Sequence, residues 1–368
     1  MCTRVLFTNK KRNNLVGRNM DWAVNPTPQL WAMPKGVQRK AMAKTSTGEE
    51  FSWTSAYSSI VVSNFDCAIS DGMNSEGLTA NILWLSNSIY PEHPQKEGYY
   101  PMSMSIWAQY ILDICKTVKD AVIAMNNIYI QTTIIPGSKK LGTCHLAVGD
   151  NDGNSAIFEY IDGHLNVFSN VKIDKKTYNH KYWKYTKDQV RVMANDPFFN
   201  IQIESLTYWN ELNKKYASAD TAALLPGSNL SLSRFVRATY FSKQMTAEVK
   251  NEFALAQLAA VMNNAAQPAT KTEGEESEDL SRTQYISLAD QRKLRYFFRS
   301  RYSPFMIWID LKKVNFDQLK PTKKKKQRAL KVELNDFGVY DANEDYGSGN
   351  VTNQLKPHVM LDFLEIPS

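Results

Sequence analysis

The second residue of this 368-residue chain combines two groups that could do chemistry together. Cys2 follows Met1, and loss of an initiator Met before a small residue would leave a cysteine with both a thiol and a free α-amine. An α-amine has a reference pKa of about 8, so it is partly neutral at physiological pH and can act as general base for its own side chain. The thiolate formed in this way is a nucleophile. A cysteine in second position is often incidental, so the case for catalysis depends on its surroundings.

The segments after Cys2 predict a β-hairpin. Residues 3–8 and 14–20 are strand-like and flank a polar turn. A hairpin centred near Lys11 would set Cys2 opposite Asp21. The carboxylate of Asp21 could then hold the α-amine.

The same hairpin would bring Arg18 close to Cys2. A guanidinium there would lower the pKa of the thiol and orient an acyl group. Arg18 and Asp21 are three residues apart, so a regular strand would direct them to opposite faces. We therefore expect a bend near Met20.

Metal and redox sites are not indicated. The chain has four cysteines and five histidines, with no C-x-x-C or H-E-x-x-H spacing. The cysteines other than Cys2 are expected to be buried apolar residues. The sequence thus predicts no metal and no cofactor.

The formal charge of +7 raises the question of nucleic-acid binding. Much of the excess lies in a Lys-rich loop at 320–331, without interleaved aromatic residues or a binding motif. We interpret it as solvated surface and expect no nucleic-acid partner. No stretch approaches the about 20 apolar residues of a membrane span.

Strands and helices are grouped rather than regularly alternating. Strand-like segments fill residues 2–90 and return at 145–168 and 284–310, and the predicted helices cover 105–115, 118–125, 201–216 and 247–264. This grouping indicates an α+β layered fold. We expect one domain over residues 1–368, with an inserted loop at 171–190.

With Gly17-Arg18-Asn19-Met20-Asp21-Trp22 following Cys2, the chain resembles the choloylglycine hydrolase family, which includes bile salt hydrolases and penicillin V acylases. The resemblance continues in the family's order to about residue 315, through Ser70-Asp71-Gly72-Met73-Asn74-Ser75-Glu76-Gly77-Leu78, Ala194-Asn195-Asp196-Pro197, Leu225-Pro226-Gly227, Ser233-Arg234-Phe235-Val236-Arg237 and Thr283-Gln284-Tyr285.

The resemblance implies a four-layer αββα sandwich of the N-terminal-nucleophile hydrolases. It implies that Cys2 is the nucleophile and that Arg18 and Asp21 are its polar partners. Asn195 matches the side chain that stabilises the oxyanion, and Arg234 matches a second, supporting arginine. The resemblance also implies a reaction without a cofactor.

The chain departs from part of the family at Trp84, where Gram-positive bile salt hydrolases carry Asn. A second oxyanion donor would then be the backbone N–H of Trp84, and Trp22 and Trp84 would line an aromatic pocket. Alternatively, both tryptophans pack in the core. The pairing resembles the Gram-negative branch of the family, for which penicillin V and long-chain N-acyl-homoserine lactones are typical substrates.

The leading hypothesis is an amidohydrolase acting on a small-molecule amide that joins a hydrophobic acyl group to a small polar amine. The alternatives are a conjugated bile salt hydrolase and a non-catalytic protein that binds a hydrophobic ligand. By analogy with relatives we expect a homotetramer. A signal peptide removed before Cys2 would make the protein periplasmic; otherwise we expect it in the cytoplasm.

Overall fold

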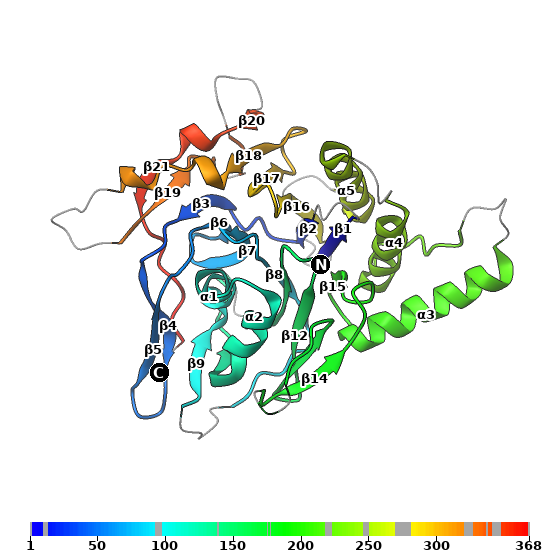
Figure 1. The fold of residues 1–368 in the computed structure, drawn as a ribbon, viewed down its shortest axis with the longest axis horizontal. Coiled ribbons are helices and arrows are strands. Elements are labelled where there is room, and N and C mark those ends of the chain that lie inside the picture. The colour runs from blue at the N-terminus through cyan, green and yellow to red at the C-terminus, as the bar shows by residue number, and fades with distance from the viewer. Residues whose placement is uncertain are drawn as a thin grey trace.

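Two large β-sheets lie face to face, and helices cover their outer faces (Figure 1). The computed structural model describes residues 2–9, 14–92, 98–137, 140–174, 176, 178–217, 223–245, 250–268, 281–319, 327–335, 338–340 and 347–366. This arrangement is the four-layer αββα sandwich that the resemblance implies, and the α+β class is confirmed.

The seven-stranded sheet contains the N-terminus of the described chain. Its pairs are antiparallel except the last one. In order across the sheet its strands are β15 (Val192–Ala194), β1 (Thr3–Thr8), β2 (Asn14–Trp22), β16 (Arg282–Asp290), β17 (Arg295–Ser300), β18 (Ile307–Asp310) and β20 (Gly349–Asn350).

The ten-stranded sheet forms the other inner layer. Its strands follow the order β14 (Lys181–Lys184), β13 (His164–Ser169), β12 (Ser155–Ile161), β11 (Cys144–Gly149), β8 (Thr79–Trp84), β7 (Ala68–Asn74), β6 (Ser59–Asn64), β3 (Gln29–Met33), β19 (Arg328–Val332) and β21 (Lys356–Val359). Two small sheets pair β4 (Gln38–Lys44) with β5 (Glu50–Thr54) and β9 (Tyr100–Ser103) with β10 (Ile128–Gln131).

Each sheet carries its own pair of helices. Helices α1 (Trp107–Ile114) and α2 (Val118–Ala124) pack on the ten-stranded sheet, whereas α4 (Ser231–Gln244) and α5 (Asn251–Ala265) pack on the seven-stranded sheet. Helix α3 (Phe199–Tyr216) contacts α4 and then extends away from the layers (Figure 1). No helix in the described part of the chain is long and apolar enough to cross a membrane.

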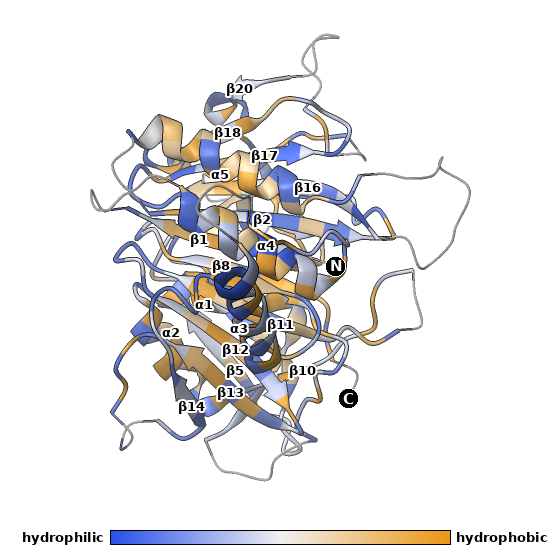
Figure 2. Cartoon of the chain, turned by 90° about the vertical axis from the view of Figure 1, so that its right-hand side faces the viewer, coloured by the Kyte–Doolittle hydropathy of each residue, from blue (hydrophilic) through white to orange (hydrophobic). Residues whose placement is uncertain are grey.

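Burial on both faces explains why the inner strands are almost continuously buried. β1 shows no alternation of buried and exposed residues, because one face meets the other sheet and the other face meets α4 and α5. Hydrophobic segments gather in the middle of the layered body, whereas many of the loops at its edges are hydrophilic (Figure 2).

Three sequence-based expectations change here. The segment 171–190 is not only a loop, because β14 lies within it and extends the ten-stranded sheet. Of the expected Lys-rich loop at 320–331, residues 320–326 lie outside the described part, and the remainder is mostly strand β19. Helix α4 was not predicted at all.

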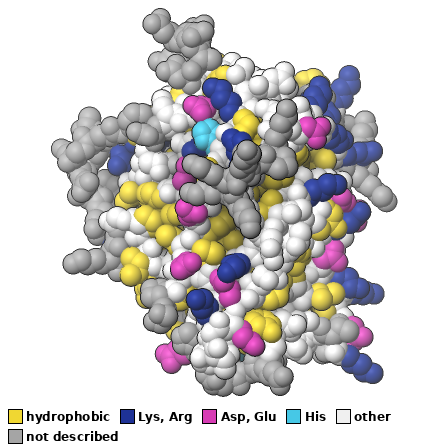
Figure 3. All heavy atoms as spheres, turned by 90° about the vertical axis from the view of Figure 1, so that its left-hand side faces the viewer, with side chains coloured by type: hydrophobic (Ala, Val, Ile, Leu, Met, Phe, Trp, Pro, Cys, Tyr) yellow, Lys and Arg dark blue, Asp and Glu magenta, His cyan; other side chains and the backbone are white. Residues whose placement is uncertain are grey.

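One face of the molecule shows how its surface charge is arranged. On the face in Figure 3, Asp and Glu side chains lie among the Lys and Arg side chains of the right-hand margin. Hydrophobic side chains separate other charged groups on this face (Figure 3).

Candidate active site

Cys2 lies directly before β1 and is 2% exposed. β1 is hydrogen-bonded on both sides, to β2 and to β15. The register pairs Thr3 with Asn19 on one side and with Ala194 on the other. One residue further along, Cys2 is level with Met20 and with Asn195. Strand pairing alone therefore brings Asn195 beside Cys2.

The predicted hairpin exists, but its register was predicted one residue off. Met20, and not Asp21, lies opposite Cys2. The Sγ of Cys2 is 3.7 Å from the Sδ of Met20 and 3.9 Å from the main-chain oxygen of Asp21. Asp21 thus approaches the sulfur through its backbone and not through its carboxylate.

Arg18 reaches Cys2 from the space between the two sheets. Its Nη2 lies 3.8 Å from Cys2 Sγ and donates to the carbonyl of Ile82 in β8 at 2.9 Å. The guanidinium also stacks over the ring of Tyr285 at 5.0 Å. Burial opposes its charge, but neighbours that include Tyr285, Cys2 and Asp71 raise the pKa of Arg18.

Asp21 faces the opposite side of β2, toward α4. Its carboxylate accepts a hydrogen bond from Thr283 Oγ1 at 2.5 Å and forms an ion pair with Arg234 Nη1 at 3.3 Å. Gln267 Nε2 lies 3.4 Å from the same carboxylate. Burial raises the pKa of Asp21, against the lowering effects of Arg234 and Thr283.

The expected bend in β2 is replaced by an irregularity in its neighbour. Thr283 pairs with Asp21, whereas Tyr285 pairs with Met20, so Gln284 is the extra residue of a β-bulge. The bulge lets Thr283 face the Asp21 carboxylate while Tyr285 faces the space between the sheets. Arg18 and Asp21 keep to opposite faces, as strand geometry requires.

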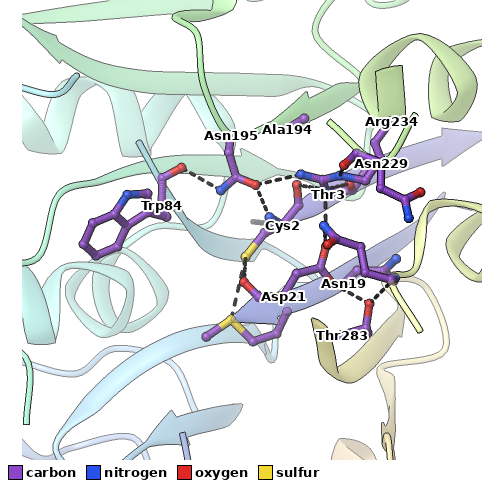
Figure 4. A network of polar contacts seen from close by, with 12 residues as sticks. Cys2, Thr3, Asn19, Asp21, Trp84, Ala194, Asn195, Asn229, Arg234 and Thr283 are labelled. Atoms are coloured by element: carbon purple, nitrogen blue, oxygen red, sulfur yellow. Dashed lines mark hydrogen bonds and ion pairs between the residues drawn. The ribbon is translucent and has the colours of Figure 1, made fainter. Parts of the chain in front are cut away.

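Asn195 and Arg234 complete the group around Cys2 (Figure 4). The Oδ1 of Asn195 accepts from the nitrogen of Cys2 and, at 3.2 Å, from Arg234 Nη2, while its Nδ2 donates to the carbonyl of Trp84 at 2.7 Å. Arg234 Nη1 donates to the carbonyl of Cys2 at 2.6 Å and to Thr3 Oγ1 at 2.5 Å. Burial lowers the pKa of Arg234, and the nearby Asp21 and Cys2 counteract it.

The backbone of Trp84 points away from β11. Leu85 N donates to Thr143 O at 3.0 Å, which makes those two a hydrogen-bonded pair of the antiparallel ladder. Hydrogen-bonded and non-hydrogen-bonded pairs alternate along such a ladder. Trp84 is the next residue, so its N–H and C=O are directed to the other edge of β8.

That edge of β8 meets the residues around Cys2. β7 pairs with β8 only as far as Asn81, so the later carbonyls are free of ladder bonds on this side. Arg18 binds the carbonyl of Ile82, and Asn195 binds the carbonyl of Trp84. The N–H of Trp84 lies on the same edge, between these two contacts.

The two tryptophan side chains are each half-buried. Trp22 packs edge-on against Phe65, with ring centroids 5.7 Å apart, and the indole N–H of Trp84 donates to Ser86 Oγ at 3.0 Å. Trp22 packs on the core that contains Cys2, and Trp84 packs on the core beneath α1 and α2. A pocket formed by both rings stays a prediction.

Thr283, Gln267 and Gln284 were not predicted as site residues. The first two bind the carboxylate of Asp21, and the third donates to the carbonyl of Trp22 at 2.8 Å. The segment Thr283-Gln284-Tyr285 was noted in the sequence only as part of the resemblance. Pairing between β2 and β16, which are far apart in sequence, is what gives it a role.

Within the described ranges, no three His, Cys, Asp or Glu side chains come together as metal ligands. All four cysteines are free. Cys115 and Cys144 are buried as expected, but Cys67 is only half-buried.

Comparison with known proteins gives this site its context. Residues 2–324 match the choloylglycine hydrolase family of linear amide C–N hydrolases. The chain belongs to the choloylglycine hydrolase family. It is therefore a hydrolase of linear amide C–N bonds.

Two relatives within the choloylglycine hydrolases span most of the chain. A penicillin V acylase from Pectobacterium atrosepticum is 31% identical over 336 residues, which cover 86% of this chain and 82% of the relative. A bile salt hydrolase/transferase from Clostridium perfringens is 25% identical over 337 residues, covering 86% and 94%.

Solved structures of choloylglycine hydrolases share the fold. A penicillin V acylase from Agrobacterium tumefaciens has a TM-score of 0.78 at 29% identity, over 99% of this chain and 100% of that one. A mutant conjugated bile acid hydrolase from Clostridium perfringens has a TM-score of 0.65 at 24% identity, over 86% and 94%, and this likeness concerns the fold alone.

Proposed function

We propose that Cys2, once Met1 is removed, is the nucleophile of this hydrolase. The position of Cys2 carries the proposal: its nitrogen donates to Asn195 Oδ1, and its sulfur lies 3.8 Å from Arg18 Nη2. A thiol, its own backbone nitrogen and a guanidinium therefore meet in one buried place. Removal of Met1 turns that nitrogen into an amine that can act as a base.

The chemistry needs only the amide substrate and water. The α-amine of Cys2 takes the thiol proton, and the thiolate attacks the amide carbonyl carbon to form a C–S bond. The ammonium then protonates the departing nitrogen as the C–N bond breaks, which leaves a thioester. Water gives a proton to the same amine and attacks the thioester carbon; the C–S bond breaks, the carboxylic acid leaves, and the ammonium returns its proton to the sulfur.

Two donors serve the oxyanion formed in each attack. The amide nitrogen of Asn195 has two hydrogens, and only one of them is needed for the carbonyl of Trp84. The second, together with the N–H of Trp84, is assigned to the oxyanion. A donor of this kind contributes about 3 kcal/mol to transition-state stabilisation.

Three charged residues near Cys2 have separate roles in this mechanism. Arg18 stabilises the thiolate, since a cation close to a thiol favours its ionised form. Arg234 fixes the orientation of the Asn195 amide, because its Nη2 must face the oxygen and not the nitrogen. Asp21 balances the charge of Arg234 and of the α-ammonium when that group carries the proton.

We propose that the substrate joins a hydrophobic acyl group to a small polar amine, as penicillin V and long-chain N-acyl-homoserine lactones do. Trp22 directly follows Asp21, whose main-chain oxygen lies near Cys2 Sγ, and the main-chain carbonyl of Trp84 binds Asn195; both tryptophan side chains are half-buried. Penicillin V acylases are among the relatives. A bile salt hydrolase/transferase is also a relative, which keeps a conjugated bile salt as the second candidate.

Rates measured on three substrates test the proposed acyl preference. Penicillin V, a glycine-conjugated bile salt and a long-chain acyl-homoserine lactone should be compared under the same conditions. Faster turnover of penicillin V or the lactone supports the proposal, whereas a clear preference for the bile salt contradicts it. Binding of all three without turnover would indicate a protein that only holds a hydrophobic ligand.

Two measurements test the nucleophile. Cys2→Ala should abolish turnover, and hydrolysis that survives in this variant rules out the cysteine mechanism. Mass spectrometry of the active protein should show a chain that lacks Met1. An active enzyme that keeps Met1 would exclude the α-amine as the base.

A further inference from the structure

A buried glutamine forms hydrogen bonds with the backbone around Asn195. Gln202, in the first turns of α3, is fully buried. Its Nε2 donates to the carbonyl of Asn195 at 2.6 Å and to that of Pro197 at 2.8 Å, and its Oε1 accepts from Ala194 N at 3.0 Å. One side chain thus binds residues on both sides of Asn195 and Asn195 itself.

We propose that Gln202 is the positioning residue for Asn195, and this inference rests on the oxyanion role proposed for Asn195. The two hydrogens and the oxygen of the Gln202 amide are committed to this stretch of backbone. Gln202 touches no reacting group. Its effect on the reaction passes through the place and orientation of the Asn195 amide.

These hydrogen bonds matter because Asn195 lies outside regular secondary structure. β15 ends at Ala194 and α3 begins at Phe199, so Asn195 lies in a four-residue link. Its side chain must bind the carbonyl of Trp84 with one hydrogen and leave the other for the oxyanion. Displacement of such a donor by about 1 Å is enough to lower the rate substantially.

The start of α3, which carries Gln202, is fixed to the ten-stranded sheet. Glu159 of β12 accepts from Phe199 N, with its two oxygens at 3.0 and 3.2 Å, and also contacts His145 Nδ1 at 2.8 Å. Glu159 and His145 are fully buried. A carboxylate at the N-terminus of α3 stabilises the helix there, which fixes the turn that carries Gln202.

A second residue, Ser86, also holds the link that contains Asn195. Ser86, just after β8, donates through its N and its Oγ to the carboxylate of Asp196, at 2.8 and 2.9 Å. Its Oγ accepts from the indole of Trp84. The link that contains Asn195 is thereby joined, through Ser86, to the end of the strand that supplies the other proposed oxyanion donor.

The test uses Gln202→Met, which keeps the size of the side chain and removes its hydrogen bonds. We expect kcat for amide hydrolysis to fall on the order of 10- to 100-fold, with KM changed less than about twofold. Gln109→Met is the matched control, because Gln109 is also a fully buried helical glutamine but lies in α1. An equal loss in both variants, or a change in KM alone, overturns the inference.

A double-mutant cycle separates positioning from general damage. If Gln202 acts through Asn195, Gln202→Met should cost less than about twofold in kcat once Asn195→Ala is present, because coupled residues are not additive. Full additivity overturns the inference. Gln202→Glu, which cannot donate to the two carbonyls as a carboxylate, should repeat the result if the Met variant does not fold.

A crystal structure of the Gln202 variant gives a readout that does not depend on turnover. The inference requires the Asn195 amide to have left its hydrogen bond with the carbonyl of Trp84. An unmoved Asn195 contradicts it. An inactive wild-type enzyme, or an active Cys2→Ala variant, would instead contradict the proposed function, and the crystallographic result would still decide the role of Gln202.

Discussion

The residues around Cys2 divide according to the face of β2 from which they come. Arg18 and Met20 face the space between the sheets and meet the sulfur, whereas the carboxylate of Asp21 faces α4 and meets Arg234. The sequence spacing predicted this division correctly but led us to expect a bend that would undo it. No bend is needed, because the β-bulge in β16 lets Thr283 bind the carboxylate of Asp21.

Thr283→Val tests how much the Asp21 carboxylate depends on that bulge. The hydroxyl of Thr283 donates to Asp21 at 2.5 Å and accepts from Gln267 N at 2.8 Å. Valine leaves a buried carboxylate without one of its donors, so we expect a loss of about 1–3 kcal/mol in the free energy of unfolding and a lower kcat. Chemical denaturation and initial rates measure the two effects.

Thr239→Val is the matched control for this prediction. Thr239 is also buried, but its hydroxyl donates to the carbonyl of Phe235 within helix α4. We expect it to lose less stability than Thr283→Val and to retain its activity. Similar losses in the two variants would mean that the hydrogen bond to Asp21 has no special importance.

At the scale of elements, the sequence predicts those whose buried residues are apolar. Strands β1 and β2 and helices α3 and α5 were predicted close to their observed positions. Helix α4 was missed because its buried face includes Ser231, Arg234, Thr239 and Ser242, so hydrophobic periodicity is weak. Of these residues, Arg234 contacts the carbonyl of Cys2 and the carboxylate of Asp21. Polar side chains on the buried face therefore weaken the pattern by which a helix is predicted.

Strands at or near the sheet edges were hard to predict for a different reason. β14 has the exposed and half-buried pattern Lys-Tyr-Trp-Lys and is a strand only because β13 pairs with it. The Lys-rich composition of residues 320–331 likewise predicted a loop, although part of this range is strand β19, which pairs with β3. Pairing partners distant in sequence decide such elements, and local patterns do not reveal them.

Gly72→Ala tests the packing of α1 on the ten-stranded sheet. A Cβ at Gly72 would lie 2.7 Å from the carbonyl oxygen of Ile60 and 2.8 Å from a methyl group of Leu112. Backbone cannot yield cheaply, so we expect a loss of about 1–3 kcal/mol in the free energy of unfolding. Gly227→Ala is the control, because a Cβ there meets nothing within 4 Å. Equal stability of the two variants would contradict this account of the packing.

At the scale of the whole molecule, the expected homotetramer remains a prediction with a direct measurement. Light scattering on the purified protein should give four times the 42.0 kDa mass of the chain. Relatives are the basis of this expectation. A mass equal to one or two chains at micromolar concentration would show that the analogy does not hold here.

The two sheets are joined by buried polar contacts as well as by apolar packing. Asp71 of β7 accepts from Asn81 at 2.6 Å within its own sheet and from Ser287 of the opposite sheet. Arg18 lies near enough to favour its charge. Burial nevertheless dominates and raises the pKa of Asp71. A carboxyl group at the contact between the layers therefore holds its proton more tightly than a free aspartic acid does.

Asp71→Asn makes this tighter proton binding measurable. A folded-state pKa above the unfolded value of about 3.9 means that the folded protein holds the proton more tightly. The stability from this proton is complete below pH about 4 and is lost as pH rises through the folded pKa, by about 1.4 kcal/mol for each unit of elevation. Asn cannot titrate. The unfolding free energy of the wild type minus that of Asp71→Asn should therefore fall from pH 4 to 8 in denaturant titrations, because other groups largely cancel. A difference that grows with pH would mean that Arg18 outweighs burial and that the Asp71 carboxylate is the form that the folded protein prefers.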